Sequence, residues 1–265
     1  MPEGDVVWYT ARRLHDALAG RILTRSDFRV PRLATADLSG ATVTETISRG
    51  KHLLTRTDNG ITVHTHLRMD GSWRVTPATD PVRDSHRIRL VLANQAWQAT
   101  GYQLGVVELV RTRDEQRVTG HLGPDLLGPD WDLGEAVRRL TAQPDRPIGE
   151  ALMDQRNLAG IGNLYASEML FLRGVSPWLP VRDVADLDAL VAAGQRLLEA
   201  NKARIGQVTT GDATRGRQTW VYGRAYQPCR RCGTRISRGE QGPAGEERVR
   251  FWCPACQESG RGGLL

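Results

Sequence analysis

Removal of the initiator Met1 would leave Pro2 as an N-terminal secondary amine, with the carboxylic acid of Glu3 beside it. An α-amino group titrates near about 7.7–8.0, so this nitrogen is partly a free base at neutral pH, whereas a lysine at about 10.4 is mostly protonated. Such an amine can attack an electrophilic carbon, and the neighbouring acid can move protons during the elimination that follows. Proline and an early acid are also common where a helix begins, so these two residues alone favour helix initiation over catalysis.

Four cysteines, all near the C-terminal end, form two Cys-x-x-Cys pairs. Twenty residues separate Cys229 and Cys232 from Cys253 and Cys256, a spacing typical of a closed, tetrahedral thiolate site for structural Zn²⁺. Residues 229–256 contain too few apolar side chains to form a core without a metal. We therefore predict one structural zinc ion per chain.

A third stretch, residues 154–168, places Gly160 and Gly162 between two helical patterns. The missing side chains would let backbone N–H groups and a helix N-terminus approach a phosphate, to which the amide of Asn163 can donate. Taken alone, a glycine-rich segment between helices is more often only a turn.

The elements before residue 120 are one helix followed by strands. Apolar residues at helical spacing predict a helix from Asp5 to Gly20, which begins at the Pro2–Glu3 end. Residues 21–112 are short runs rich in Val, Thr, Ile and Leu, with the clearest hairpin at 47–67 around Asp58-Asn59-Gly60. This pattern predicts an antiparallel β-sandwich covered by the first helix.

Residues 120–130 are dense in Gly and Pro and have no sustained period, which indicates a domain boundary. Beyond them, apolar spacing predicts helices at 132–140, 148–155, 163–172 and 183–205, followed by a loop at 206–219. The fold class is therefore α+β, and we expect domains at 1–122, 131–220 and 221–265.

The charge balance favours a polyanionic partner. Lys and Arg number 36 against 30 Asp and Glu, which gives a net charge of +6. No apolar run approaches the roughly 20 residues that cross a bilayer, and the charged first residues do not form a secretory signal. We expect a cytoplasmic monomer with no membrane segment, in a compartment where paired cysteines bind metal before they form disulfides.

These stretches together resemble the Fpg/Nei family of DNA glycosylases, in the same order along almost the whole chain. The matching positions are Pro2-Glu3, Gly50-Lys51, residues 154–168, and Val221-Tyr222-Gly223-Arg224 ahead of the paired cysteines. The resemblance implies an N-terminal β-sandwich, a helix-two-turns-helix domain and a C-terminal zinc finger, with damaged DNA bound in the cleft between the domains. It also implies a base-excision-repair DNA glycosylase with AP lyase activity.

Carried over to the matching positions, the resemblance implies that Pro2 is the Schiff-base nucleophile and Glu3 the general acid/base. It implies that Lys51, Asn163 and Arg248 bind the phosphates around the lesion. Met69 would fill the space left by a flipped nucleotide, although a Met in a β-turn packed on the sandwich is nearly as good an explanation. The expected reaction is attack of the Pro2 nitrogen at C1′, loss of the base, and β,δ-elimination of both flanking phosphates.

Departures from the family pattern bear on the substrate. The Arg-Phe-Gly loop of enzymes for oxidised guanine is absent after residues 101–105, and the segment 206–219 is short. Both favour the endonuclease VIII branch and oxidised pyrimidines, with a base pocket expected at Tyr102, Gln103 and Leu104. The Gln-Leu-Tyr of some endonuclease VIII proteins is also absent, and Val6 replaces a second early Glu. A purine-directed enzyme and a catalytically silent DNA-binding protein remain as alternatives.

Overall fold

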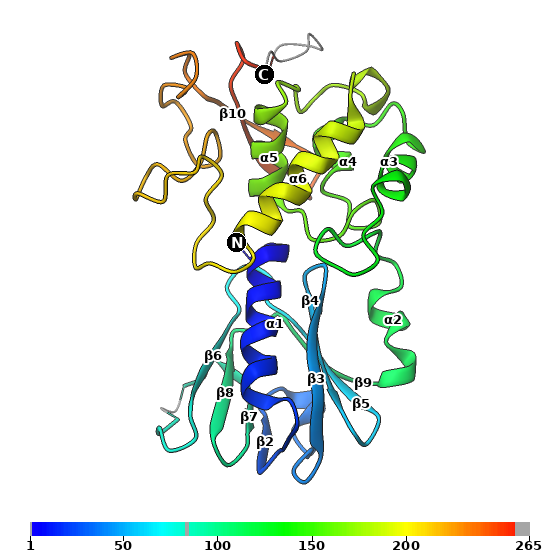
Figure 1. Cartoon of the computed structure of the whole chain (residues 1–265), viewed down its shortest axis with the longest axis vertical. Coiled ribbons are helices and arrows are strands. Elements are labelled where there is room, and N and C mark those ends of the chain that lie inside the picture. The colour runs from blue at the N-terminus through cyan, green and yellow to red at the C-terminus, as the bar shows by residue number, and fades with distance from the viewer. Residues whose placement is uncertain (1, 83–84, 258–265) are drawn as a thin grey trace. The chain divides into compact units, whose positions relative to one another are not determined.

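The computed structural model describes residues 2–82 and 85–257. The chain divides into two compact units, Met1–His121 and Leu122–Leu265 (Figure 1). None of the helices in the described ranges has the length and apolar character needed to cross a bilayer.

The first unit is a helix packed on two antiparallel sheets. Helix α1 (Gly4–Leu18) leads into β1 (Arg21–Ile22), β2 (Arg25–Phe28), β3 (Thr42–Arg49), β4 (His52–Thr57), β5 (Ile61–His66), β6 (Ser72–Pro77), β7 (Ile88–Ala93), β8 (Trp97–Tyr102) and β9 (Val106–Arg111). One sheet has the order β1-β3-β4-β5-β9 and the other β2-β7-β8-β6. The 3₁₀ helices η1 (Pro31–Leu33) and η2 (Thr112–Asp114) and the short α2 (Gln116–Thr119) complete the unit. The predicted β-sandwich with a flanking helix is confirmed.

The core of this unit joins the apolar face of α1 to strands of both sheets. Val7, Leu14 and Leu18 of the helix are buried, as expected from their helical spacing. They pack in one cluster with apolar residues that include Leu53, Val63, Leu90, Leu92 and Ala99. The start of α1, which carries Pro2 and Glu3, is therefore attached to a rigid core.

The hairpin of β4 and β5 has the turn that its sequence predicts. Gly60 has a φ of 77°, a conformation that favours glycine. The resulting register pairs His52 with His66 and Leu54 with His64. This register brings histidines from two strands together, as described below.

The second unit is helical and ends in a β-hairpin. It contains α3 (Leu133–Thr141), α4 (Ile148–Ala151), α5 (Asn163–Leu172), η3 (Val181–Asp183) and α6 (Leu187–Asn201), then β10 (Ser237–Gln241) paired with β11 (Arg248–Trp252). Nine of the ten residues of α5, from Asn163 to Phe171, are buried. Because α5 is surrounded, it is the central element of this unit.

Two predicted helices are shorter than their apolar patterns suggested, and side chains explain where they end. The helix expected at 148–155 ends at Ala151, whose carbonyl accepts a hydrogen bond from the Asn157 side chain at 2.9 Å. The helix expected at 183–205 begins at Leu187, after Asp186 caps it by accepting from the Ala189 N–H. It ends at Asn201, whose side chain exchanges two hydrogen bonds with the backbone of Val208.

Candidate functional site

The N-terminal pair lies where α1 begins. Pro2 is half-buried, and Glu3 is the N-cap residue with 0% of its surface exposed. The Glu3 carbonyl accepts from the Val7 N–H at 3.0 Å, but the Glu3 side chain makes no capping hydrogen bond. A capping hydrogen bond therefore does not explain the burial of this carboxyl group. Met1 lies outside the described residues.

Lys51 and Met69 lie in two turns of the same unit. Lys51 is half-buried in the turn from β3 to β4, next to Gly50, whose φ of 55° favours glycine. Met69 is 58% exposed in the turn after β5, so it does not pack into the sandwich core. The roles of Lys51 as a phosphate ligand and of Met69 as a wedge stay predictions.

A histidine cluster follows Lys51, and sequence analysis missed it. Nδ1 of His52 lies 2.8 Å from Nε2 of His64, and the two rings stack. The rings of His66 and His121 meet His52 edge-on, at centroid distances of 5.0 and 5.9 Å. Burial lowers the pKa of His52 to about 3 and that of His66 to about 4, so both rings are uncharged at neutral pH. Pairing the predicted hairpin in register could have revealed this cluster.

Asn163 and Arg248 come together in the second unit. Asn163 is the first residue of α5 and donates from Nδ2 to the carbonyl of Val249 at 2.7 Å. Val249 directly follows Arg248 in β11, and the Arg248 side chain is exposed. Two phosphate ligands predicted from separate stretches thus lie at one junction between α5 and the hairpin.

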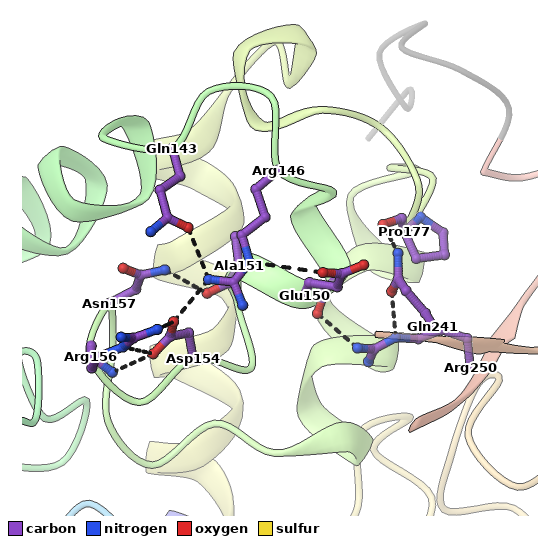
Figure 2. Close-up of polar contacts among 11 residues, drawn as sticks. Gln143, Arg146, Glu150, Ala151, Asp154, Arg156, Asn157, Pro177, Gln241 and Arg250 are labelled. Carbon is purple, nitrogen blue, oxygen red and sulfur yellow. Dashed lines mark hydrogen bonds and ion pairs between the residues drawn. The ribbon is translucent and has the colours of Figure 1, made fainter. Parts of the chain in front are cut away.

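A second arginine of β11, which the sequence analysis did not select, holds this junction. Arg250 is 1% exposed and donates from Nη1 to Oδ1 of Asn163 at 2.8 Å. Its Nε donates to Gln241 at 2.9 Å and its Nη2 to the carbonyl of Gly149 at 2.8 Å (Figure 2). Strand alternation could not have selected it, because residues two apart in a strand share a face. Arg248 is nevertheless exposed while Arg250 is buried, so only the tertiary contacts distinguish the two arginines.

Arg248 also borders a charged hollow of about 330 Å³. Its charged lining consists of four arginines and three carboxylates, namely Arg146, Arg156, Arg248, Arg250, Glu150, Asp154 and Glu246. Asp154 accepts from Arg146 at 2.8 Å and from Arg156 at 2.7 Å (Figure 2), and hydrogen bonding to Arg156 holds the pKa of this carboxyl well below its usual range. The hollow therefore carries a surplus of positive charge, as an anion-binding surface requires.

The four cysteines lie together as their spacing predicts. All four sulfur atoms lie within 4.8 Å of one another, with Cys229–Cys256 at 4.0 Å and Cys232–Cys253 at 3.5 Å. Thiolates around a tetrahedral ion with metal–sulfur bonds of about 2.3 Å would lie about 3.8 Å apart. Hydrogen bonds from Thr234 lower the pKa of Cys232 to about 6, whereas burial raises the pKa of Cys253 and of Cys256. The cluster fits a metal site.

Glu168, the last residue of the 154–168 stretch, holds a neighbouring loop in place. Its buried carboxyl accepts from the N–H groups of Trp220, Val221 and Tyr222 at 2.7–2.8 Å and from the hydroxyl of Thr209. Burial raises the pKa of Glu168, while these four donors oppose the rise. The carboxyl thus joins both ends of the predicted loop 206–219.

The expected base pocket at Tyr102, Gln103 and Leu104 was partly wrong. Leu104 is buried in the core of the first unit, because Gly101 leaves room for its side chain. Tyr102 does line a hollow of about 320 Å³, together with Arg74, Thr76, Asp80, Pro81, Val82, Gln98 and Thr100. Of the three predicted residues, only Tyr102 borders this hollow.

Comparison with known proteins defines the class. Residues 1–104 match the formamidopyrimidine-DNA glycosylase N-terminal domain, and residues 122–208 match the formamidopyrimidine-DNA glycosylase H2TH domain. The solved structure of the Lactococcus lactis formamidopyrimidine-DNA glycosylase bound to DNA with an AP site superposes with a TM-score of 0.80 at 23% identity. That comparison covers 97% of this chain and 99% of the other and shows a shared fold.

Curated relatives are much more similar in sequence. "Probable endonuclease 8 2" of Streptomyces coelicolor is 57% identical over 97% of this chain and 94% of its own length. "Endonuclease 8 2" of Mycobacterium tuberculosis is 53% identical over 97% of this chain and all of its own length. "DNA-(apurinic or apyrimidinic site) lyase Nei2" of Mycolicibacterium smegmatis is 48% identical, covering 97% and 99%. The chain belongs to the Fpg/Nei family of DNA glycosylases and AP lyases, as its motifs predicted.

Proposed function

We propose that this enzyme removes oxidised pyrimidines from DNA and cleaves the resulting abasic site through a Schiff base on Pro2. The buried carboxyl of Glu3 beside Pro2, which no helix cap explains, is the observation that carries this proposal. The names of its relatives, which include endonuclease 8 and AP-site lyase, support the same activity.

The proposed reaction needs only these two residues at the reacting carbon. The Pro2 nitrogen forms a bond to C1′ while the C1′–base bond breaks, and Glu3 protonates the opening sugar ring. The imine then acidifies the sugar protons, so two successive eliminations expel the 3′ and 5′ phosphates. The product is a one-nucleotide gap.

Lys51, Asn163 and Arg248 would bind the phosphates around the lesion. Such contacts fix position without reading sequence, which suits an enzyme that must find damage anywhere. The surplus positive charge of the hollow beside Arg248 supports this assignment. We do not propose Arg250 as a phosphate ligand, because its Nε, Nη1 and Nη2 groups already donate hydrogen bonds within the protein.

The ion that we assign to the cysteine cluster is Zn²⁺. Four thiolates with no open position form the usual structural zinc site, and such a site holds its fold without touching substrate. The zinc site would therefore stabilise the hairpin and take no part in the chemistry. Its ligands would be Cys229, Cys232, Cys253 and Cys256.

Borohydride should trap a covalent complex with abasic DNA, and Pro2→Gly should reduce trapping strongly because a primary amine replaces the secondary one. Pro31→Gly, at the start of η1, is the matched control and should trap like the unmodified enzyme. Mass spectrometry of the intact protein must first show that Met1 is removed. Equal trapping by Pro2→Gly would refute Pro2 as the nucleophile, whereas no trapping by the unmodified protein would favour the silent DNA-binding alternative.

Oxidised pyrimidines should be excised faster than oxidised guanine. The loop 206–219 is short and closed on itself, since the Thr209 N–H donates to the Gln218 carbonyl at 2.7 Å, so little surface is left to cover a two-ring base. Single-turnover rates on matched duplexes with thymine glycol, dihydrouracil or oxidised guanine opposite cytosine test the ranking. Faster release of oxidised guanine would favour the purine-directed alternative.

A further inference from the structure

The buried guanidinium of Arg250 is part of a chain of hydrogen bonds within the second unit. The chain starts at the carbonyl of Pro177, which accepts from Nε2 of Gln241 at 2.8 Å. Because the amide nitrogen of Gln241 is used there, its oxygen faces Arg250 and accepts from Nε at 2.9 Å (Figure 2). The orientation of the Gln241 side chain is therefore fixed at both ends.

Gly149 leaves the room that this chain of hydrogen bonds needs. A Cβ atom at position 149 would overlap Oε1 of Gln241 and lie 2.9 Å from the carbonyl oxygen of Pro177. The carbonyl of Gly149 accepts from Nη2 of Arg250 at 2.8 Å. Helix α4, to which Gly149 belongs, thus supplies a further acceptor that fixes the plane of the guanidinium.

The same guanidinium sets the orientation of the Asn163 amide. Nη1 of Arg250 donates to Oδ1 of Asn163 at 2.8 Å, and Nδ2 of Asn163 donates to the Val249 carbonyl at 2.7 Å. An arginine has donors and no acceptor, so it can bind only the oxygen of that amide. The amide nitrogen carries a second hydrogen, which has no acceptor among the described residues. This N–H group, on the first residue of α5, is available to a ligand.

We propose that Arg250 is a positioning residue for DNA binding, because it holds the Asn163 amide in the orientation that presents an N–H group to a backbone phosphate. This inference rests on the proposed role of Asn163 as a phosphate ligand. Without Arg250, the Asn163 oxygen would lose the donor that holds it, and the amide could turn its N–H groups away from the phosphate. Arg250 acts through Asn163 and does not itself contact DNA.

A double-mutant cycle on the full-length enzyme tests this coupling. Affinity for a duplex with an uncleavable abasic analogue is measured for the unmodified protein, Arg250→Lys, Asn163→Ala and the double variant. Arg250→Lys keeps the buried positive charge but lacks the planar fork that reaches three acceptors. Each single substitution should weaken binding about fivefold or more, the effect of a lost hydrogen bond to a charged group. The double variant should bind no more weakly than Asn163→Ala alone.

The outcomes separate positioning from a purely structural role. If Arg250 only stabilised the hairpin, Arg250→Lys would weaken binding by the same factor with and without the Asn163 side chain, and the proposal would be overturned. Unchanged affinity of Arg250→Lys would also overturn it. Unchanged affinity of Asn163→Ala would refute Asn163 as a phosphate ligand, and the inference with it.

Gln241→Met supplies a second cycle in case Arg250→Lys does not fold, as judged by thermal melting and metal content. This substitution leaves the guanidinium in place but removes the acceptor of its Nε group. Its loss of affinity should likewise disappear in the Asn163→Ala background. An equal loss in both backgrounds would contradict the inference.

Salt dependence distinguishes a positioning arginine from one that binds phosphate directly. Arg248 and Arg250 belong to the same strand, and the first is exposed while the second is buried. Arg248→Met should flatten the log–log dependence of affinity on salt by about 0.9, the effect of one lost phosphate contact. Arg250→Met should weaken binding and leave this slope unchanged. Equal flattening by both variants would make Arg250 a phosphate ligand and would overturn the proposal.

Discussion

Cys253→Ser is expected to unfold the β10–β11 hairpin and to abolish DNA binding. Among the described residues, the buried cluster around the cysteines consists of Phe171, Val221, Ile236, Cys229 and Cys253, with Trp220, Phe251 and Cys256 partly buried against it, which is too little apolar surface to fold alone. Structural zinc contributes on the order of 10–16 kcal/mol in comparable peptides, far more than these few side chains can replace. Metal analysis should find one zinc per chain in the unmodified protein and none in the variant.

The variant Cys232→Ser shows whether the hairpin unfolds because the metal is lost or because packing is lost. Cys232 is exposed whereas Cys253 is buried, so a purely apolar role would make the first substitution mild and the second severe. If both cysteines bind one ion, the two variants should unfold the hairpin equally, as measured by proteolysis within 222–257 and by duplex affinity. A metal-free protein that binds and cleaves DNA fully would contradict the prediction.

The contacts of Arg250 connect the hairpin to the proposed phosphate ligands Asn163 and Arg248. Arg250 lies in β11, and its guanidinium bridges Gln241 of β10, Asn163 of α5 and the carbonyl of Gly149. Unfolding the hairpin would remove these bonds, and with them the Val249 carbonyl that orients the Asn163 amide. Loss of the metal should therefore disturb Asn163 as well as Arg248.

The parts predicted well from sequence are those set by local spacing. Two Cys-x-x-Cys pairs fix a metal site because each pair presents its thiols from one tight turn, and their sulfur atoms do lie together. Asp58-Asn59-Gly60 fixed the hairpin and its register in the same way, through a backbone conformation that few residues adopt. The fold class followed from such local patterns.

The parts that were missed depend on contacts between distant segments. In the sequence, nothing distinguishes Arg250 from the other basic residues of the module. Its role follows only from its hydrogen bonds to Asn163 and to the carbonyl of Gly149. The helix expected at 148–155 keeps its apolar pattern past Ala151 but ends there, because Asn157 takes the Ala151 carbonyl. Leu104 was placed in a pocket from its position after β8, although the space above Gly101 accepts it into the core. In each case tertiary packing outweighed the local pattern.

Glu3→Gln is expected to retain DNA affinity while base excision falls by about 10²–10⁴-fold, the usual contribution of a general acid/base. The amide nearly preserves the shape of a side chain that is 0% exposed, but it cannot accept and return a proton. Affinity is measured on a duplex with an uncleavable abasic analogue, and excision by single-turnover rates on thymine glycol. A large fall in rate with unchanged affinity is the signature of a group that acts in the transition state.

Asp5→Asn is the matched control, because Asp5 is a buried acid in the first turn of the same helix. A stabilising role at the helix N-terminus predicts that both substitutions lower thermal stability and that excision and affinity fall together. The proposed chemistry predicts a rate defect confined to Glu3→Gln, since Glu3 directly follows the proposed nucleophile Pro2 in the chain. If Glu3→Gln lost binding and turnover equally, the carboxyl would be structural, and the second reacting group would have to be sought elsewhere.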